Sequence, residues 1–179
     1  MENANGGSFF KEYEMRALCE EGGRAYLKAY FAEEDGKQTV SFDKEGYTAL
    51  AEAKIRNEEE LLIFISGFCD AYIRAEDCLL GPEDISFSKD SVFIAENAES
   101  SGSSAYDVRL SYIRAEEKRE DDFGNARAFL KAYLNEMRDL DSFGSIRRLT
   151  DYLEHGPCTP VRLKRYAGEL RRELRLNAF

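Results

Sequence analysis

His155 is the only histidine of the 179-residue chain, and Cys158 follows it three residues later. An imidazole and a thiol at this spacing could form half of a metal site or half of a cysteine–histidine nucleophile pair. A closed metal site needs about four ligands, and no further cysteine or histidine lies close by in the sequence. Because a helix dipole favours partial positive charge at the C-terminus, we expect His155 to lie at the end of a helix.

Other catalytic patterns give weaker signals. A serine–histidine–aspartate enzyme would have to use His155, but the chain has no G-x-S-x-G motif. The 35 acidic residues supply so many carboxylate pairs that no single pair indicates acid–base catalysis. The sequence therefore predicts no catalytic residue, no metal ligand and no cofactor, and we expect that the protein is not an enzyme.

The stretch from Leu79 to Ile94, LLGPEDISFSKDSVFI, resembles the protein-kinase segment in which the catalytic loop runs into a short hairpin. The residues that perform kinase chemistry are replaced. Ala75-Glu76-Asp77 stands where the His-Arg-Asp of a kinase would be, and Asp84 stands where the metal-binding Asn would be. Ala95-Glu96-Asn97 takes the place of Asp-Phe-Gly. Kinase catalysis is therefore excluded.

A degenerate, kinase-like nucleotide binder stays open as an alternative. It would present a concave face around Lys28 and Asp84. Against such a site, the turn Glu20-Glu21-Gly22-Gly23 carries two carboxylates that would repel a triphosphate. A further alternative is a small-molecule sensor with an apolar pocket behind the central helix.

The charge of the chain is negative and uneven. A net charge of -10 at pH 7 argues against nucleic-acid binding, because neutralising phosphates requires a concentrated basic surface. From Ser145 to Phe179, eight Lys and Arg stand against four Asp and Glu, so this tail carries +4 and the remainder -14. These basic residues could bind an acidic partner, a phosphorylated segment or anionic lipid. They are Arg147, Arg148, Arg162, Lys164, Arg165, Arg171, Arg172 and Arg175. Alternatively, they pair with the acidic remainder of the chain.

Alternation of apolar residues in the N-terminal part predicts strands. We expect a three-stranded antiparallel meander over residues 13–19, 24–32 and 38–42, with a turn at Asp35-Gly36. Asp43 is then expected to cap a helix over residues 43–56.

Asn57 followed by Glu60 resembles the capping box of a second helix. This helix should be the central core helix, because its apolar residues form a wide stripe at helical spacing. They are Leu61, Phe64, Ile65, Phe68, Cys69 and Tyr72. A hairpin of residues 85–87 and 92–94, with a turn at 88–91, and a strand over 106–113 should follow.

The last third of the chain should be helical. Apolar residues at helical spacing predict one helix around residues 126–137 and a shorter one around 146–153. Thr159-Pro160 is a cap followed by a first-turn proline, and it predicts a third helix, which includes Leu163 and Leu174.

Two of these segments resemble an uncharacterised bacterial domain that precedes a forkhead-associated (FHA) domain in Gram-positive proteins. The first is residues 79–85, LLGPEDI, and the second is a helix with apolar residues at matching positions: Phe129, Leu130, Tyr133, Leu134, Met137, with Asp141 after them. No FHA domain fits within 179 residues, and Gly81 replaces the usual Asp or Glu. The resemblance implies an intracellular module of signalling or envelope-associated assemblies, and it implies no activity.

Targeting signals are not visible. The longest apolar run, LLIFI from Leu61 to Ile65, is far shorter than a membrane span, and the N-terminus lacks the pattern of a signal peptide. Four cysteines at irregular spacing are expected to be free thiols in a reducing compartment. We therefore expect a cytoplasmic protein.

Together these patterns predict an α+β fold. An antiparallel sheet, formed by the N-terminal meander and the central hairpin, should pack on the core helix, with a helical C-terminal part. Residues 1–115 and 116–179 are expected to pack together as one domain. The leading hypothesis is a non-catalytic protein-interaction or regulatory domain with an unknown protein partner, and a homo-oligomer is left open.

Overall fold

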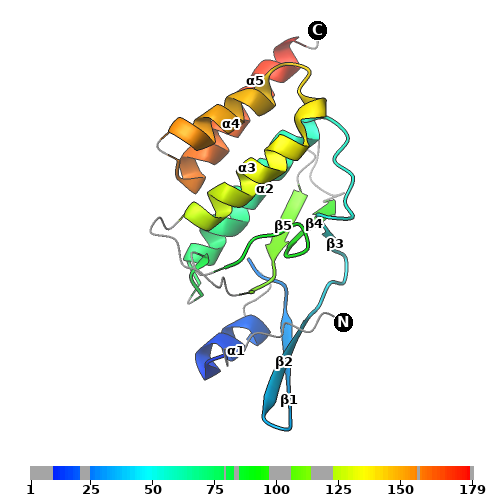
Figure 1. The fold of residues 1–179 in the computed structure, drawn as a ribbon, viewed down its shortest axis with the longest axis vertical. Helices are drawn as coiled ribbons and strands as arrows, with labels where there is room; N and C mark the ends of the chain where they lie inside the picture. The colour runs from blue at the N-terminus through cyan, green and yellow to red at the C-terminus, as the bar shows by residue number, and fades with distance from the viewer. Residues whose placement is uncertain are drawn as a thin grey trace.

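The structure, a computed structural model, describes residues 10–20, 25–78, 80–82, 85–96, 106–113, 123–156 and 158–177 (Figure 1). Its elements in chain order are α1 (Glu12–Glu20), β1 (Ala29–Glu34), β2 (Lys37–Phe42), β3 (Thr48–Ala49), α2 (Glu58–Glu76), β4 (Val92–Glu96), β5 (Tyr106–Leu110), α3 (Gly124–Glu136), the 3-10 turn η2 (Arg138–Leu140), α4 (Ser145–His155) and α5 (Pro160–Asn177). Within these residues, β1-β2 and β3-β4-β5 form two small antiparallel sheets. The expected α+β class is confirmed.

The central helix α2 begins as the sequence predicts. The backbone N–H of Glu60 donates to Asn57 Oδ1 at 2.9 Å, and the Glu60 carboxylate accepts from the backbone N–H of Arg56 at 2.8 Å. The first turn is acidic throughout, with Glu58 and Glu59 before Glu60, which matches the positive end of the helix dipole.

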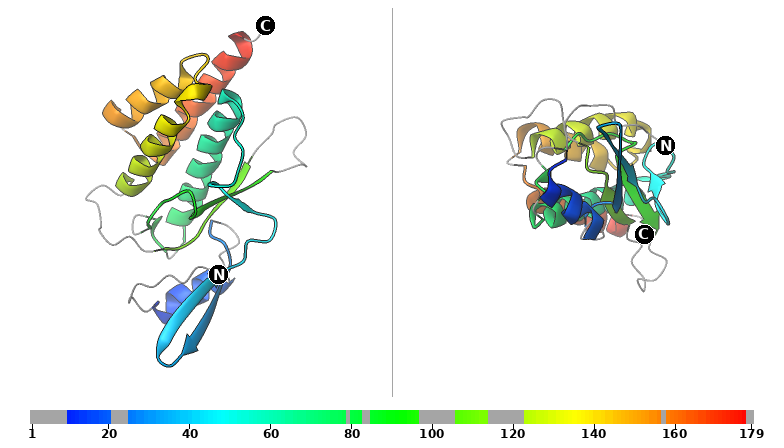
Figure 2. Two further views of the ribbon diagram at one scale, coloured as in Figure 1. Left: turned by 45° about the vertical axis from the view of Figure 1, so that its right-hand side comes forward. Right: turned by 90° about the horizontal axis from the view of Figure 1, so that it is seen from below.

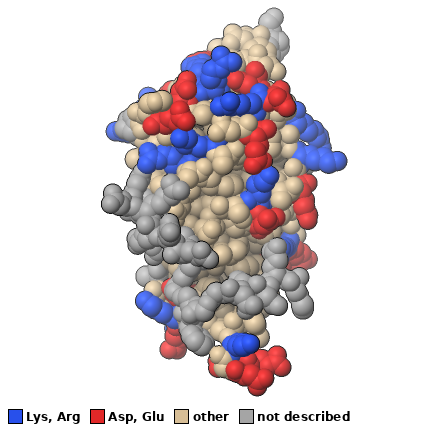
Figure 3. Space-filling view, viewed as in Figure 1, with Lys and Arg blue, Asp and Glu red and all other residues tan. Residues whose placement is uncertain are grey.

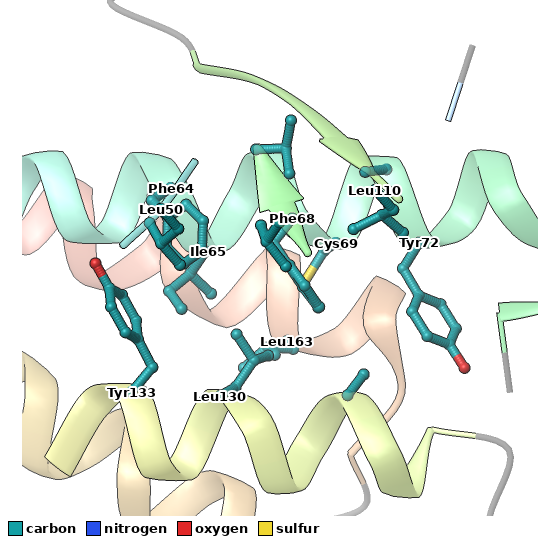
Figure 4. Close-up of a cluster of buried hydrophobic side chains, with 14 of the residues drawn as sticks. Leu50, Phe64, Ile65, Phe68, Cys69, Tyr72, Leu110, Leu130, Tyr133 and Leu163 are labelled. Carbon is teal, nitrogen blue, oxygen red and sulfur yellow. The ribbon is translucent and has the colours of Figure 1, made fainter. Parts of the chain in front are cut away.

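The apolar stripe of α2 forms the core of the molecule. Its six predicted residues are at most 1 % exposed. They meet side chains from β5, α3 and α5, among them Leu110, Leu130 and Leu163 (Figure 4). Aromatic rings of α2 and α3 pack closely, since the ring centroids of Phe64 and Tyr133 lie 5.4 Å apart. One buried cluster therefore includes residues of both the N-terminal and the C-terminal parts.

The three C-terminal helices are confirmed. Ile146, Leu149, Thr150 and Leu153 of α4 are all buried, and the hydroxyl of Thr159 caps α5 by accepting from the backbone N–H of Arg162 at 3.3 Å. In the views of Figures 1 and 2, α3 and α4 lie beside α2 and α5, and the sheet β3-β4-β5 lies on the other side of α2.

A buried carboxylate connects the starts of α2 and α4. Glu58 is 4 % exposed and accepts from the backbone N–H groups of Phe143 and Ser145 at 3.0 and 2.8 Å. Gly144, between them, has a left-handed backbone with φ of 80°, and it caps α4 without a side chain. Asp141 accepts from the next N–H group, that of Ile146, at 2.9 Å. The first turn of α4 is thus capped partly by a residue from α2.

The meander prediction is wrong for its first strand, which is the helix α1. Residues 12–20 alternate in polarity, but most are strong helix formers. Glu14 and Leu18, four residues apart, are buried on one side, whereas Tyr13 is exposed. The carboxylate of Glu14 also accepts from the backbone N–H of Lys11 at 2.7 Å and thereby caps the helix. Only β1 and β2, joined by the Asp35-Gly36 turn, form strands of the expected meander.

The prediction of a helix over residues 43–56 is also wrong. Asp43 caps a turn instead, because its carboxylate accepts from the backbone N–H of Glu45 at 3.1 Å. Gly46 follows with φ of 79°, which breaks a helix. Thr48 and Ala49 then pair with β4, and Leu50 donates to the carbonyl of Val92 at 2.8 Å. Pairing with a strand more than 40 residues later overrides the local helical pattern.

The hairpin expected between residues 85–87 and 92–94 is not formed. The turn at Ser88–Ser91 is confirmed by the bond from Ser91 N–H to Ser88 O at 3.1 Å. However, β4 pairs with β3 and β5, and Ser86 instead donates to the carbonyl of Ile113 at 2.7 Å. Other predicted features, the turn at 20–23, residues 79 and 83–84 and the domain boundary at 115–116, lie wholly or mostly outside the described residues.

The two sheets are separate, which corrects the expectation of one combined sheet. We call α1 and the β1–β2 hairpin the arm. The arm extends from one end of the molecule, opposite the C-terminal end of α5 (Figures 1 and 2). It is attached to the body through residues 25–27, where Leu27 donates to Leu110 O at 2.9 Å and Leu110 donates to Ala25 O at 3.0 Å.

The close approach of α2 and β5 gives a first prediction. A Cβ atom placed on Gly67 would lie 2.8 Å from the carbonyl oxygen of Tyr106 and 2.9 Å from a methyl group of Val108. We expect Gly67→Ala to lower the free energy of unfolding by about 1–3 kcal/mol despite the better helix propensity of alanine. Chemical denaturation of the two proteins measures this.

Gly168→Ala in α5 is the matched control. It is also within a helix, but a Cβ atom there meets nothing within 4 Å. This substitution should raise the free energy of unfolding by about 1 kcal/mol. Equal effects of the two substitutions on the free energy of unfolding would show that β5 leaves enough space for a Cβ atom at position 67.

Candidate functional site

The site predicted from the sequence consists of the basic residues of the C-terminal tail. In the structure these residues form two groups, one that contacts α2 and one that faces solvent. Three of them point from α5 to carboxylates of α2. Lys164 binds Asp70 at 2.5 Å, Arg171 binds Glu59 at 3.0 Å, and Arg175 binds Glu59 at 2.6 Å. Part of the positive charge of the tail therefore compensates acidic residues of the core helix.

The other basic residues face solvent on α4 and α5. Arg148 binds Glu173, and Arg165 binds Glu169 one turn along the same helix. The three remaining basic residues of the tail form no ion pair within the part of the chain that the structure describes. They are Arg147, Arg162 and Arg172. Figure 3 shows basic and acidic side chains interspersed over the helical end of the molecule. This surface has no single extended positive patch in that view.

Glu59 shows how these pairs affect ionisation. Burial by itself would raise the pKa of its carboxyl group, but hydrogen bonds from Arg175 and Arg171 outweigh burial and hold the pKa below the ordinary value. Folding therefore favours the charged form of Glu59.

A second polar cluster lies on the sheet. Asp107 and Arg109 are on the face of β5 opposite Val108, whose side chain contacts α2. The hydroxyl of Tyr47 donates to Asp107 Oδ2 at 2.6 Å, and Arg109 donates to the same carboxylate at 3.0 Å and to the Tyr47 hydroxyl at 3.0 Å. Burial, together with the bond to Asp107, raises the pKa of Tyr47. Tyr47 is therefore a neutral donor that holds Asp107 and Arg109 in place.

Tyr47 and Arg109 of this cluster line an open pocket of about 280 Å3 at the base of the arm. The pocket combines residues before β1, residues after β2 and one residue of β5. Its lining consists of Tyr26, Leu27, Lys28, Asp43, Glu45, Tyr47 and Arg109. The pocket includes Arg109, which lies on the sheet face away from α2, so it differs from the apolar pocket that the alternative of a small-molecule sensor places behind the central helix.

Lys28 and Asp43 face each other across the β1–β2 hairpin, since the Asp43 N–H donates to Lys28 O at 2.8 Å. Lys28 nevertheless places its ammonium over the Tyr30 ring, 5.4 Å from the centroid. The Asp43 carboxylate accepts from the Tyr30 hydroxyl at 3.4 Å. Lys28 and Asp43 form no ion pair with each other among the described contacts.

His155 and the cysteines are the residues considered for nucleophilic or metal chemistry. His155 is the exposed last residue of α4, with Nδ1 3.3 Å from the carbonyl oxygen of Asp151. The four cysteines are free, and burial raises the pKa of the Cys69 thiol. Among the described residues, no group of three or more His, Cys, Asp or Glu side chains is arranged to hold a metal ion. Asp84 lies outside them.

Comparisons with protein-family models, with curated proteins and with solved structures found no match. The resemblance to the FHA-associated domain therefore stays a prediction. In the part of the chain that is described, none of the helices has the length and apolar character needed to cross a membrane.

Sequence reasoning singled out Lys28 and Asp43 for other reasons, and it missed Tyr47, Asp107 and Arg109. A weak signal was present, since Asp107 and Arg109 alternate with buried residues along a strand. The contact of Tyr47 with Asp107 joins residues 60 positions apart, which no local pattern indicates.

Glu59 gives a pH-dependent prediction. Its folded pKa lies below the ordinary value of 4.5, so its contribution to stability is present above that value and is lost as the pH falls through the folded pKa. Because the pair is partly exposed, Glu59→Gln should cost at most about 1 kcal/mol at pH 7. The difference from wild type should shrink below about pH 4.5 in denaturation series.

Glu52→Gln serves as the control, because Glu52 is exposed and precedes α2. It should change stability little at any pH. If Glu59→Gln lowers the free energy of unfolding by the same amount at pH 7 and at acidic pH, the packing of the Glu59 side chain, and not its charge, is responsible for the stabilisation.

Proposed function

We propose that the chain is a non-catalytic protein-interaction module and that the arm is the surface that binds the partner. The observation that supports this proposal is the position of the arm, which extends from the body and is attached through residues 25–27 (Figure 1).

The arm has structural features of a binding element. Its sheet has only two strands within the described residues, so the outer edges of both β1 and β2 lack a strand partner there. A two-stranded hairpin is marginally stable by itself. The helix α1 supports it on one side, where Cys19 Sγ donates to the carbonyl of Ala29 at 3.2 Å. Phe10, just before α1, also contacts Phe31, with ring centroids 5.0 Å apart.

The exposed side chains of the arm suit a protein partner with a basic surface. Tyr13 and Tyr30 are 47 % and 50 % exposed, and tyrosine is enriched at protein interfaces. The tip of the hairpin is acidic, with Glu33, Glu34 and Asp35 in succession. A basic partner surface would complement this charge and accelerate association.

Photo-crosslinking in the cells that make the protein tests the proposal. A photoreactive phenylalanine analogue at position 30 or 13 should give a crosslinked band of defined mass. The same analogue at position 176, at the far end of α5 and 78 % exposed, is the control and should give none. Crosslinks from position 176 alone, or ATP hydrolysis or phosphotransfer by the purified protein, would contradict the proposal.

Nucleotide binding stays the second candidate because the structure does place Lys28 in a concave site. Asp43 and Glu45 line the same pocket, and their charges oppose a triphosphate. We therefore favour the interaction module. A cytoplasmic location, a role in signalling assemblies like those of FHA-associated domains, and binding of acidic groups by Arg147, Arg162 and Arg172 remain proposals that accompany it.

A further inference from the structure

The outer edge of β2 is an open sheet edge within the described residues. The backbone N–H of Asp43 donates to Lys28 O at 2.8 Å, so the odd-numbered residues of β2 are those that bond to β1. In an antiparallel pair these residues alternate with residues whose backbone groups point outward. The outward residues are Gln38, Val40 and Phe42, and no partner for their backbone groups is found in the described part of the chain. Such an edge is a template for a further strand.

The other strand edges are covered or short. At the start of β1, Cys19 Sγ of α1 donates to the outward carbonyl of Ala29 at 3.2 Å. The outer edge of β5 faces α2, where Arg74 donates to Val108 O at 3.2 Å. Strand β3 has only two residues. Among the described strands, β2 therefore offers the edge along which a complete strand can add.

A second copy of β2 matches this edge in an antiparallel register centred on Val40. The outward groups belong to even-numbered residues, so these residues must lie opposite one another to bond across the new pair. With Val40 opposite Val40 of the second copy, residues 37–43 of both chains overlap along their whole length. Gln38 then lies opposite Phe42, and each chain contributes the same groups. The pairing is therefore self-complementary, as a two-fold interface requires.

The side chains that this register brings together are complementary. Lys37 lies opposite Asp43 of the second copy, and symmetry produces this ion pair twice. Thr39 lies opposite Ser41, so their hydroxyls can hydrogen-bond. These are the non-hydrogen-bonded pairs, in which the Cα atoms are only about 4.5 Å apart and the side chains are closest. In a register shifted by two residues, Asp35 and Asp43 would lie opposite each other and repel.

The groups of the Lys37–Asp43 pair are accessible. Lys37 is exposed and forms no ion pair within the residues that the structure describes. The Asp43 carboxylate accepts from the Glu45 N–H at 3.1 Å and from the Tyr30 hydroxyl at 3.4 Å, so acceptor positions remain on its two oxygens. On the other face of β2, the side chain of Val40 is only partly buried, and a second strand would cover it.

The position of the arm permits this pairing. The arm extends from the end of the molecule that is opposite the C-terminal end of α5 (Figures 1 and 2). Because β2 runs from the hairpin tip to the base of the arm, antiparallel pairing places the two bodies at opposite ends of the shared sheet. The two-stranded hairpin, which is marginally stable by itself, then becomes half of a four-stranded sheet.

We propose that the chain forms a two-fold homodimer in which β2 pairs with β2 of a second copy, with Val40 at the axis. The proposal rests on the arm being an interaction surface, as proposed above, and it names the occupant of one edge of the arm. Because each chain contributes one short strand, the dimer is weak, with a Kd of about 10–100 µM.

Analytical ultracentrifugation of the full chain tests the dimer at concentrations from about 1 µM to 1 mM, which bracket this Kd. The mass should rise from 20.4 kDa toward twice that value. Over the same range, amide exchange measured by NMR should slow severalfold at Gln38, Val40 and Phe42, because their N–H groups point to solvent in the monomer and bond to the second strand in the dimer.

Val40→Pro tests whether the β2 edge is the interface. The N–H of residue 40 points away from β1, so the β1–β2 ladder does not use it, and proline is tolerated at such an edge position. The variant should stay folded by circular dichroism and should dimerise at least about tenfold more weakly. Val40→Thr, which keeps the N–H and the β-branched shape, is the matched control and should dimerise within about threefold of wild type.

A charge exchange tests the register. Lys37→Glu places like charges opposite each other twice and should weaken dimerisation about tenfold. Adding Asp43→Lys to this variant restores opposite charges and should bring the Kd back to within about threefold of wild type. Arg16→Glu, the same change of charge on an exposed residue of α1, is the control and should leave the Kd unchanged.

Three results would overturn the proposal. They are a mass of 20.4 kDa at every concentration, an unchanged Kd for Val40→Pro, and a Kd for the charge-exchanged double variant that is no tighter than that for Lys37→Glu. A monomeric purified chain whose arm crosslinks to a different protein in cells would refute the homodimer and leave the interaction module intact. A dimer without any crosslink to a different protein would do the reverse for the partner with a basic surface.

Discussion

The burial of helix α2 on several sides is the constraint on which the rest of the structure depends. Sheet β3-β4-β5 packs on one side through β5, and α3 and α5 pack on others (Figure 4). Full burial of one large apolar side chain contributes about 1.5–3 kcal/mol, so the stripe from Leu61 to Tyr72 outweighs any single surface contact. Because Gly67 has no Cβ atom, β5 can approach the backbone of α2 closely.

The charges of the molecule are arranged around this core. A tail of +4 beside a remainder of -14 suggests either a binding surface or internal pairing. The structure shows internal pairing for part of the tail, because Arg171 and Arg175 bind Glu59, whereas Arg162 and Arg172 contact no carboxylate in the described part. Net charge therefore cannot identify a binding surface here. The face of α5 on which each residue lies decides its role.

The parts of the fold that the sequence predicted share a physical cause. Helices α2, α3, α4 and α5 have apolar residues at helical spacing, and Asn57 and Thr159 mark the starts of two of them. These signals are local, so a single sequence contains them. The errors have non-local causes. Residues 48–49 form a strand because they pair with β4. Residues 85–87 do not pair with β4, because β3 and β5 occupy both of its edges. The pocket follows the same rule, since Arg109 and Tyr47 are 62 positions apart and lie together because β3, β4 and β5 pair.

The carboxylate of Glu58 links the start of α2 to the start of α4, regions that are 85 and more positions apart in the sequence. The amides of Phe143 and Ser145 lie at the junction of a loop and α4, where local fraying usually exposes them to solvent. Since both amides donate to a carboxylate that is only 4 % exposed, moving α4 away from α2 would leave a buried acceptor without these two donors. Hydrogen exchange at these two amides would then report the separation of α4 from the start of α2 rather than local fraying.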